Sequence, residues 1–588
     1  MNILGINAFH GDSSAALFSN GRLETAIEEE RLNRIKHWAG LPVGAAAECL
    51  KGTDPRELRH VAVSRNPRAH LVRKLLRTAL HPYLWKRVPG RARNGVDIYR
   101  AVPQMRTQGV EIPSDVRFHT VEHHRSHMAS AFFASPFEEA AVVSVDGFGD
   151  FSSAMWGVGR GNKFDIRGCL RFPHSLGMFY TAFTQFLGFP KYGDEYKMMG
   201  LAAYGSPEMF GQVREVLHAD GTDVRLNLDY FKHHTTGVEM TWEGGEPALG
   251  PVYSNKMLEV FGPARVARTE VLPQHADMAA SVQAVLEEAY FGLLNAVARE
   301  TGQRTLCLAG GVALNCAANG KIFDMTPFRD LYVQPAAHDA GTSIGAALYV
   351  QHQVLGMPRS YVMRDVYCGP AYDDAEIGRE LGAAGVQYER LNPDELLTRT
   401  AAAIADGNIV GWFQGRMEFG PRALGNRSIL ADPRRKQMKD ILNKRIKYRE
   451  PFRPFCPSIL AEACGEYFET DYPSPFMVQA YRIKPSRRDR IPAVTHEDGT
   501  GRLQTVERDV NPLYWSLIER FGAMTGVPVL LNTSFNENEP IVHTPRQAIE
   551  CFSRTQMDVL VIGSYFMSKA ANTRLTEGKT AFAQAEPQ

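Results

Sequence analysis

The chain has 588 residues, of which 44% are hydrophobic and 22% are charged, and its formal net charge is +1. This length exceeds what one hydrophobic core supports, so we expect a globular protein of at least two domains. The near-neutral charge gives no electrostatic case for binding nucleic acid or a membrane surface. We find no signal peptide, no long apolar membrane span and no C-x-x-C pair among the eight cysteines. These features predict a cytoplasmic protein without an integral membrane segment.

Two segments of the N-terminal part resemble each other. Residues 3–17 and residues 142–156 each begin with a short apolar run, turn through Gly and Asp, and continue after Ser-Ser-Ala. The order predicts a strand–turn–strand unit in each segment. A unit that occurs twice indicates a duplicated α/β domain.

Two more glycine turns follow predicted strands further along the chain. Residues 305–309 form an apolar run before Gly310-Gly311, and residues 331–333 precede a glycine-containing turn at 338–345. Glycine turns at strand ends let backbone N–H groups approach a phosphate. Four such turns in series are typical of actin-like ATPases, so we expect an actin-like domain over residues 1–355.

The pattern changes after a predicted linker at residues 353–366. Short loops that contain arginine beside Gly, Pro or Phe replace the glycine turns, and we expect a second α/β domain over residues 365–570. Planar guanidinium groups bind phosphate with two hydrogen bonds, so these loops suit a polyphosphate. Solvated surface arginines are the alternative. Lys447 is either another phosphate partner or part of a basic helix face, and the turn after Asn532 suits a nucleotide or an Asx-turn.

A histidine pair is the strongest candidate for a metal site. His123 and His127 are spaced i, i+4, so they share one face of a predicted helix and can bind one ion. Asp146, at the end of a predicted strand, and Asp339, in the fourth glycine turn, are candidate third and fourth ligands. Such a set suits Fe, Mn or Zn. The alternative is a helix cap with solvent-facing histidines.

Residues 65–110 form a basic insert with no catalytic motif. Ten Lys or Arg residues lie between Arg65 and Arg100 against one acidic residue. The apolar positions follow helical spacing: Leu71, Leu75, Leu76, Leu80, Tyr83, Leu84 and Trp85. We expect a basic amphipathic helix that ends at Pro89-Gly90, with Arg73, Lys74 and Arg77 on its exposed face. It either packs its leucines on the first domain or contacts an acidic or amphiphilic acceptor; membrane-surface association is a weaker variant.

Several motifs taken together resemble the O-carbamoyltransferases of the NodU/CmcH type. The resemblance covers roughly residues 1–570. The motifs are Glu28-Glu-Glu-Arg31 with Lys36-His37, His123-x₃-His127, Asp146-Gly, Lys197-Met-Met-Gly, Gly310-Gly-Val-Ala-Leu-Asn315, Gly420-Pro-Arg-Ala-Leu-Gly425 and Leu531-Asn-Thr-Ser-Phe-Asn536. The resemblance implies a duplicated actin-like, threonylcarbamoyl-transferase-like N-terminal domain and a YrdC-like C-terminal domain. It also implies that ATP and carbamoyl phosphate form carbamoyl-adenylate, from which the carbamoyl group passes to a hydroxyl of a small-molecule acceptor.

The family pattern also assigns roles to single residues. His10, Lys36 and Asp146 would be catalytic, with His10 as the base, although His10-Gly-Asp differs from the His-Asp of many relatives. An iron-type metal would be held by His123, His127, Asp146 and Asp339. The nucleotide or carbamoyl-adenylate in the transfer site would contact Lys36, Ser175, Gly311 and Asn315. ATP, with Mg²⁺, and carbamoyl phosphate would contact Arg422, Lys447, Arg453, Arg502 and Asn532.

Three other functions use part of the same pattern. An actin-like small-molecule kinase needs only the glycine turns and acidic Mg²⁺ ligands. A tRNA threonylcarbamoyl-type transferase predicts a basic RNA face, which the net charge of +1 does not favour. A non-catalytic nucleotide-binding regulator predicts no turnover of carbamoyl phosphate. The sequence does not name the acceptor; a homodimer is a further expectation.

Overall fold

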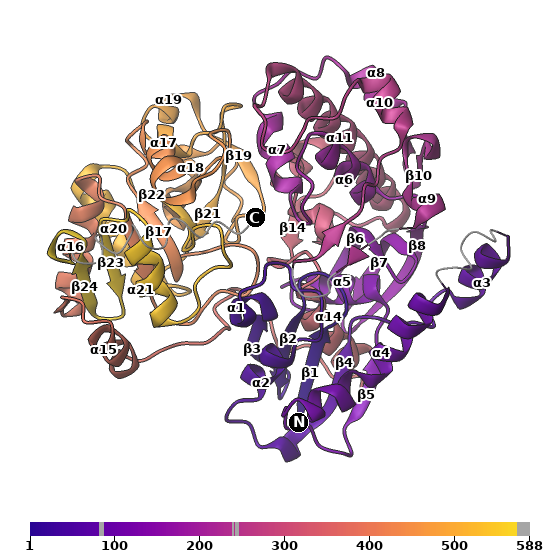
Figure 1. The fold of residues 1–588 in the computed structure, drawn as a ribbon, viewed down its shortest axis with the longest axis horizontal. Coiled ribbons are helices and arrows are strands. Elements are labelled where there is room, and N and C mark those ends of the chain that lie inside the picture. The colour runs from indigo at the N-terminus through magenta and orange to yellow at the C-terminus, as the bar shows by residue number, and fades with distance from the viewer. Residues whose placement is uncertain (81–87, 238–239, 242–245, 573–588) are drawn as a thin grey trace. The chain divides into compact units, whose positions relative to one another are not determined.

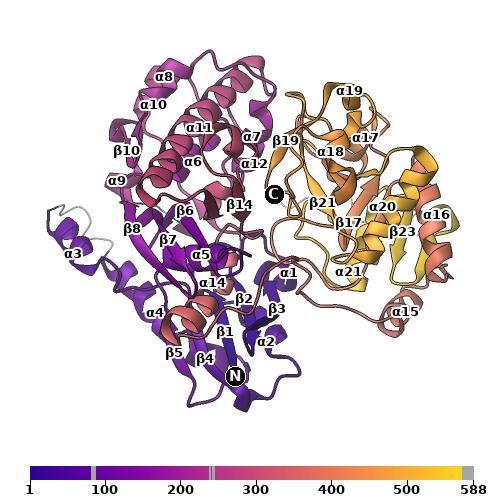
Figure 2. The same ribbon diagram turned by 180° about the vertical axis from the view of Figure 1, so that it is seen from behind.

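The computed structural model describes residues 1–80, 88–237, 240–241 and 246–572 (Figures 1 and 2). The chain is a mixed α/β protein that divides into two compact units, Met1–Met363 and Arg364–Gln588. Within the described ranges, no helix is both long and apolar enough to cross a membrane.

The first unit begins with a five-stranded sheet in the order β3-β2-β1-β4-β5. Its strands are β1 (Asn2–Asn7), β2 (Ser14–Ser19), β3 (Arg22–Glu28), β4 (Leu58–Val63) and β5 (Arg117–Thr120). The first three strands are antiparallel neighbours, and β1, β4 and β5 run parallel. Strand β1 is buried over its whole length, as its continuous apolar run predicts.

A second five-stranded sheet has the same order and the same strand directions. Its strands are β6 (Glu139–Gly149), β7 (Ser152–Arg160), β8 (Lys163–Arg171), β13 (Thr305–Ala309) and β14 (Asp330–Val333). Strands β6, β7 and β8 are antiparallel neighbours, and β6, β13 and β14 run parallel. The similar segments 3–17 and 142–156 thus occupy equivalent places in two sheets.

Two helices of the first unit cross at very close range. Helix α5 (His123–Phe132) and helix α14 (Gly341–Tyr349) pack against each other. A Cβ atom added at Gly345 would lie 1.8 Å from the carbonyl oxygen of Ser126, so only glycine allows this approach. The crossing brings Asp339, two residues before α14, towards the histidines of α5. On the far side of the second sheet's strands lie α6 (Leu176–Phe186), α7 (Glu195–Ala202) and the long α11 (Pro273–Thr301) (Figure 1).

The second unit has one eight-stranded mixed sheet in the order β15-β24-β23-β16-β17-β22-β18-β21. The strands in that order are Glu389–Arg390, Tyr565–Ser568, Val559–Ile562, Val410–Phe413, Arg427–Ala431, Val529–Ser534, Cys456–Leu460 and Gln504–Val506. Strands β16, β17 and β18 and the first four residues of β22 are buried, because the hydrophobic core of this unit lies against them. The longer helices are α15 (Asp374–Ala383), α16 (Pro393–Ala405), α20 (Pro512–Thr525) and α21 (Pro545–Arg554).

The basic insert differs from its predicted form. It contains α3 (Leu71–Leu80) and α4 (Val88–Thr107), so the expected helix end at Pro89-Gly90 is wrong. A proline in the first turn of a helix lacks only an N–H that has no intrahelical acceptor there, which explains why α4 includes it. The predicted positions Tyr83, Leu84 and Trp85 lie outside the described residues.

The face of α3 that contacts the first unit is also not the predicted one. Its apolar side chains are between 47% and 75% exposed, namely Leu71, Val72, Leu75, Leu76 and Leu80. Arg73 is exposed as expected, but Lys74 and Arg77 are partly buried. The guanidinium carbon of Arg77 lies 4.6 Å from the ring centroid of Phe172. The cationic side of α3, not its leucine side, therefore contacts the body of the protein.

Candidate functional site

Two histidines and two aspartates converge at one point in the first unit. His123 and His127 lie on the first turns of α5, whose N-terminus is capped by Glu122 through the Arg125 N–H. Asp146 lies on β6, and Asp339 follows β14. The i, i+4 spacing places both imidazoles on one helix face, directed towards the two carboxylates.

The four side chains have the spacing of a metal site. His123 Nε2 is 3.2 Å from Asp146 Oδ2 and 3.1 Å from His127 Nε2, which is 3.4 Å from Asp339 Oδ1. One donor atom from each residue lies within 4.8 Å of all the others, and all four residues are buried. Asp339 Oδ1 is buried and accepts no hydrogen bond from the described residues. Solvent-facing histidines do not describe this arrangement, whereas two imidazoles and two carboxylates fit a first-row transition metal or zinc.

His10 lies beside this cluster. Its Nδ1 contacts Asp339 Oδ2, and its Nε2 is 3.3 Å from the carbonyl oxygen of Phe148. Burial lowers the pKa of the imidazole, but the Asp339 carboxylate outweighs burial and raises the pKa above its ordinary value. Asp339 thus directs one oxygen to His10 and the other to the histidine pair. The glycine after His10 does not remove its side chain from the cluster.

Two more of the expected residues contact Asp146, and a third lies in the neighbouring glycine turn. The N–H of Gly311 donates to Asp146 Oδ1 at 2.9 Å. The hydroxyl of Ser175, which caps α6, is 3.0 and 2.8 Å from the carbonyl oxygens of Asp146 and Gly147. Asn315 exchanges two amide hydrogen bonds with Gln283, at 3.0 and 3.1 Å. Gly311 and Ser175 therefore fix the Asp146 strand end, while Asn315 ties the third glycine turn to α11.

The loop that carries Lys36 is fastened near His10. Next to Lys36, His37 Nδ1 is 2.6 Å from Asp12 Oδ1, and the His37 N–H donates to Glu30 at 2.7 Å. Burial lowers the pKa of His37, but Asp12 and Glu30 raise it to about 9. The ion pair of His37 with Asp12, which is two residues after His10, thus holds the loop that carries Lys36.

In the second unit, Asn532 on β22 is the centre of a buried amide network. Its Nδ2 donates to Ser458 Oγ and to Gln504 Oε1, both at 3.1 Å, and lies 3.4 Å from the carbonyl oxygen of Ala423. Ala423 is the neighbour of Arg422, so Asn532 connects the central strand to the loop that carries this arginine. Asn532 Oδ1 is buried and has no hydrogen-bond partner among the described residues.

Lys447 is buried and bound within the protein. Its Nζ donates to the carbonyl oxygens of Ser534 and Asn536 at 2.6 and 2.7 Å and to Asn536 Oδ1 at 2.7 Å. An ammonium group has three N–H donors, so these contacts account for its donors. In this structure Lys447 fixes the turn after Asn532, and a basic surface face does not describe it.

The arginine loops converge on the same strands. Arg502 ends β20 (Thr500–Arg502), and its Nε donates to Cys456 Sγ at 2.9 Å. Cys456 is the strand partner of Asn532. Arg453 lies just before β18, and its side chain is 3.7 Å from Glu450. The contacts place Arg502 and the Arg422 loop around Asn532, with Lys447 at the following turn.

Glu418 organises the loop that contains Arg422. Its Oε1 accepts hydrogen bonds from the N–H groups of Leu424, Asn426 and Arg427 at 2.7, 2.8 and 3.2 Å. Arg427 is fully buried, and burial lowers the pKa of its guanidinium to about 10. Its carbon lies 3.7 Å from the ring centroid of Phe413. A buried carboxylate and a buried guanidinium therefore fix both ends of the loop.

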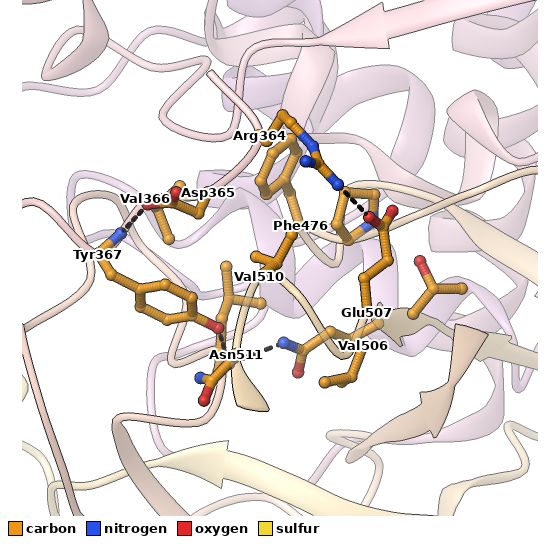
Figure 3. Close-up of a pocket in the computed structure, with 13 residues that line it drawn as sticks. Arg364, Asp365, Val366, Tyr367, Phe476, Val506, Glu507, Val510 and Asn511 are labelled. Carbon is orange, nitrogen blue, oxygen red and sulfur yellow. Dashed lines mark hydrogen bonds and ion pairs between the residues drawn. The ribbon is translucent and has the colours of Figure 1, made fainter. Parts of the chain in front are cut away.

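A small pocket of the second unit adjoins this network (Figure 3). Gln504 and Leu424 both line it, and the Tyr367 hydroxyl and Gln504 Nε2 each donate to the Leu424 carbonyl oxygen at 2.7 Å. Arg364 pairs with Glu507 at 2.7 Å on its rim. Gln504 thus separates the pocket from Asn532.

Sequence reasoning missed Gln504, Ser458, Glu418 and Asp150. Glu418 stands two residues before the Gly-Pro-Arg motif, and a lone acid in a loop of low charge was the available signal. Asp150 accepts from the His123 N–H at 3.0 Å and from the Asn66 N–H at 2.7 Å, so it joins α5 to the basic insert. Nothing in the local pattern distinguishes Ser458 or Gln504 from ordinary strand residues.

The buried cluster of imidazoles and carboxylates is a candidate active site, because catalytic groups with shifted pKa values gather at such sites. Residues 2–348 match the family described as carbamoyltransferase N-terminus, and residues 401–569 match the carbamoyltransferase C-terminus. The chain therefore belongs to the carbamoyltransferase family.

Individual relatives agree with this assignment. An uncharacterized protein of Synechocystis sp. is 40% identical over 97% of both chains. The nodulation protein NolNO of Sinorhizobium fredii is 39% identical over 96% of this chain and 80% of its own. The 3'-hydroxymethylcephem-O-carbamoyltransferase of Amycolatopsis lactamdurans is 29% identical over 77% of this chain and 81% of its own.

Proposed function

We propose that this protein is an ATP-dependent O-carbamoyltransferase that works in two steps. The second unit forms carbamoyl-adenylate from carbamoyl phosphate and ATP, and the first unit passes the carbamoyl group to a hydroxyl of a small molecule. The observation that carries the proposal is the buried His123, His127, Asp146 and Asp339 cluster with His10 against Asp339, in a chain of the carbamoyltransferase family. The printed name of the cephem relative, an O-carbamoyltransferase, supports a hydroxyl acceptor.

The first step belongs to the arginine loops. Carbamoyl-adenylate carries a single phosphate, which comes from ATP. Water therefore first hydrolyses carbamoyl phosphate to carbamate and inorganic phosphate. The carbamate oxygen then attacks the α-phosphorus of ATP, and pyrophosphate leaves. Arg422, Arg453 and Arg502 neutralise the developing charge on the phosphates, assisted by Mg²⁺. Asn532 Oδ1, which has no hydrogen-bond partner in the described part of the chain, is offered as an acceptor, and Lys447 keeps the adjoining turn in place.

The second step belongs to the first unit. The acceptor oxygen attacks the carbamoyl carbon, the bond from that carbon to the AMP oxygen breaks, and His10 takes the hydroxyl proton. Lys36, Ser175, Gly311 and Asn315 line the nucleotide side of this site. The structure supports structural duties for Ser175 and Gly311, which orient Asp146 through hydrogen bonds. His123, His127, Asp146 and Asp339 would hold an Fe, Mn or Zn ion, which would supply a Lewis acid for the carbamoyl oxygen.

The fold proposals follow the same division. Two sheets of equal order support a duplicated actin-like domain over residues 1–355, and the mixed sheet of the second unit is compatible with a YrdC-like domain over residues 365–570. A cytoplasmic homodimer without nucleic-acid partners remains part of the proposal.

One assay separates the proposed function from its rivals. The protein is incubated with ATP and carbamoyl phosphate, and pyrophosphate and inorganic phosphate are measured, with mass spectrometry of an alcohol panel for replacement of H by CONH₂. A kinase would release ADP and need no carbamoyl phosphate, and a regulator would show no turnover. Absence of carbamoyl-phosphate-dependent pyrophosphate would refute the two-step scheme.

A further inference from the structure

The apolar face of helix α3 points away from the body of the protein. At about 100° per residue, Leu71, Val72, Leu75, Leu76 and Leu80 all lie within one half of the helix circumference. Their side chains are between 47% and 75% exposed. Figures 1 and 2 both show α3 at the outer edge of the first unit. A surface helix normally buries such a face, so the leucines of α3 are open to a partner outside the chain.

Contacts on the polar side of α3 hold the helix in this orientation. The guanidinium carbon of Arg77 lies 4.6 Å from the ring centroid of Phe172, and Arg77 Nη2 donates to the carbonyl oxygen of His234 at 3.2 Å. Just before the helix, His70 Nε2 is 3.2 Å from Ser152 Oγ. A rotation that buried the leucines would break the contacts of Arg77, so the outward direction of the apolar face is built into the fold.

Charge distinguishes the basic insert from the rest of the chain. Ten Lys or Arg residues against one acidic residue give residues 65–100 a formal net charge of +9, whereas the whole chain has +1, so the remaining residues carry −8. Arg68 and Arg73 are exposed. Arg73 is next to Leu80 on the helix circumference, so a cation borders the apolar face. An anionic surface is therefore attracted to the insert that carries the exposed leucines, while the net charge of the other residues opposes its approach elsewhere.

The size of the apolar face distinguishes a lipid surface from a protein partner. A stable protein–protein interface takes about 20–30 residues from each side. Helix α3 has 10 residues, and five apolar side chains are too few for such an interface. An interfacial helix needs no matching groove, because its apolar side chains enter the acyl boundary of a bilayer and its cations lie among anionic headgroups. The observations thus favour an anionic lipid surface over an acidic protein or a second copy of this chain.

We propose that α3 docks the first unit on a lipid surface that contains anionic headgroups. Leu71, Leu75 and Leu76 enter the acyl boundary, and Arg73 lies among the headgroup phosphates. The contact is peripheral and reversible, because one short helix buries little apolar area. The inference goes beyond the proposed carbamoyl transfer and does not depend on it.

The test measures co-sedimentation of the full-length protein with vesicles. One set is phosphatidylcholine alone, and the other contains about 30% phosphatidylserine. At low salt the wild type should bind the anionic vesicles about tenfold more tightly or better, and added salt should reduce this preference. Leu75→Gln with Leu76→Gln should weaken binding to the anionic vesicles about tenfold or more, because two apolar side chains no longer enter the acyl boundary. Arg73→Gln should weaken it about fivefold.

Two further variants control for the loss of apolar surface and of charge. Met325→Gln with Val354→Gln replaces two apolar side chains that are each 52% exposed, and Arg379→Gln removes an exposed guanidinium from the second unit. Both should bind the vesicles as the wild type does. Every replaced side chain is exposed, so the melting temperatures of all variants should equal that of the wild type.

Each outcome decides the proposal. Binding to neither kind of vesicle, equal affinity for the two compositions, or the same loss in the control variants as in the α3 variants would overturn it. A change of oligomeric state in Leu75→Gln with Leu76→Gln, measured without vesicles, would also overturn it, because the face would then bind a second copy of the chain. Vesicle binding is measured without ATP or carbamoyl phosphate, so a failure of the proposed carbamoyl transfer would leave this result unchanged.

Discussion

The Oε1 atom of Glu418 lies 3.2 Å from the backbone nitrogen of Arg427, and the same oxygen accepts two more N–H groups from the loop between them. Three donors on one buried carboxylate oxygen fix the path of the chain from Leu424 onwards. Arg422 is two residues before Leu424, and the carbonyl oxygen of the next residue, Ala423, lies 3.4 Å from Asn532 Nδ2, so the position of Arg422 depends on that path. We therefore propose that Glu418 acts on the phosphate site indirectly, as a positioning residue for the loop that carries Arg422.

Replacement of Glu418 by Gln tests this role. A neutral amide oxygen accepts weaker hydrogen bonds than a carboxylate, so we expect the KM for ATP in pyrophosphate release to rise about five- to tenfold. Glu418→Asp, which keeps the charge, should restore part of the loss. Carbamoyl transfer from chemically prepared carbamoyl-adenylate should be unaffected. A melting temperature that falls while the KM stays constant would indicate a purely structural carboxylate.

The two proposed half-reactions should separate genetically. Arg453→Ala or Arg502→Ala should slow pyrophosphate release by roughly 30- to 1000-fold, because a charge-assisted phosphate contact is worth about 2–4 kcal/mol. His123→Ala should leave pyrophosphate release intact and stop transfer to the alcohol. Arg482→Ala, an exposed position on the strand paired with Arg502, is the control. Loss of the same half-reaction in both sets would contradict the division between the units.

The protein should also purify with about one equivalent of Fe, Mn or Zn, measured by elemental analysis. His127→Ala removes one of four donors, and we expect its metal affinity to fall by about a hundredfold or more. His119→Gln removes a partly buried histidine outside the cluster and should keep the metal. A fully active, metal-free wild type would contradict the proposed centre.

Local pattern predicted the parts of the fold that local chemistry determines. The strand–turn–strand segments at 3–17 and 142–156 are adjacent strand pairs in two sheets of the same order. The i, i+4 histidines lie on a helix that begins at His123. Helical periodicity and the apolar runs of buried strands depend on residues that are neighbours in sequence. They can therefore be recognised without knowledge of tertiary contacts.

Tertiary packing decided what the pattern left open. The sequence pattern predicted that the leucines of α3 face the body of the protein. In the structure Arg77 stacks on Phe172, a residue 95 positions later, so the cationic side of α3 faces the body instead. Lys447 had two interpretations, and its buried contacts with Ser534 and Asn536 appear only when the strands are assembled. Gln504 and Ser458 acquire their roles through Asn532, which neither neighbours in sequence.

The ion pair between His37 and Asp12 predicts how stability changes with pH. The ordinary pKa of histidine is 6.5, and in the folded protein Asp12 and Glu30 overcome the effect of burial and raise the pKa of His37 to about 9. A raised folded pKa stabilises the fold fully below the unfolded pKa, and that contribution is lost as pH rises from 6.5 through about 9. His37→Gln should therefore lower the melting temperature at about pH 6 and make little difference at about pH 9.5. Burial lowers the pKa of His174, so His174→Gln should not show this trend. An equal effect of His37→Gln at both pH values would mean that His37 contributes by neutral packing alone.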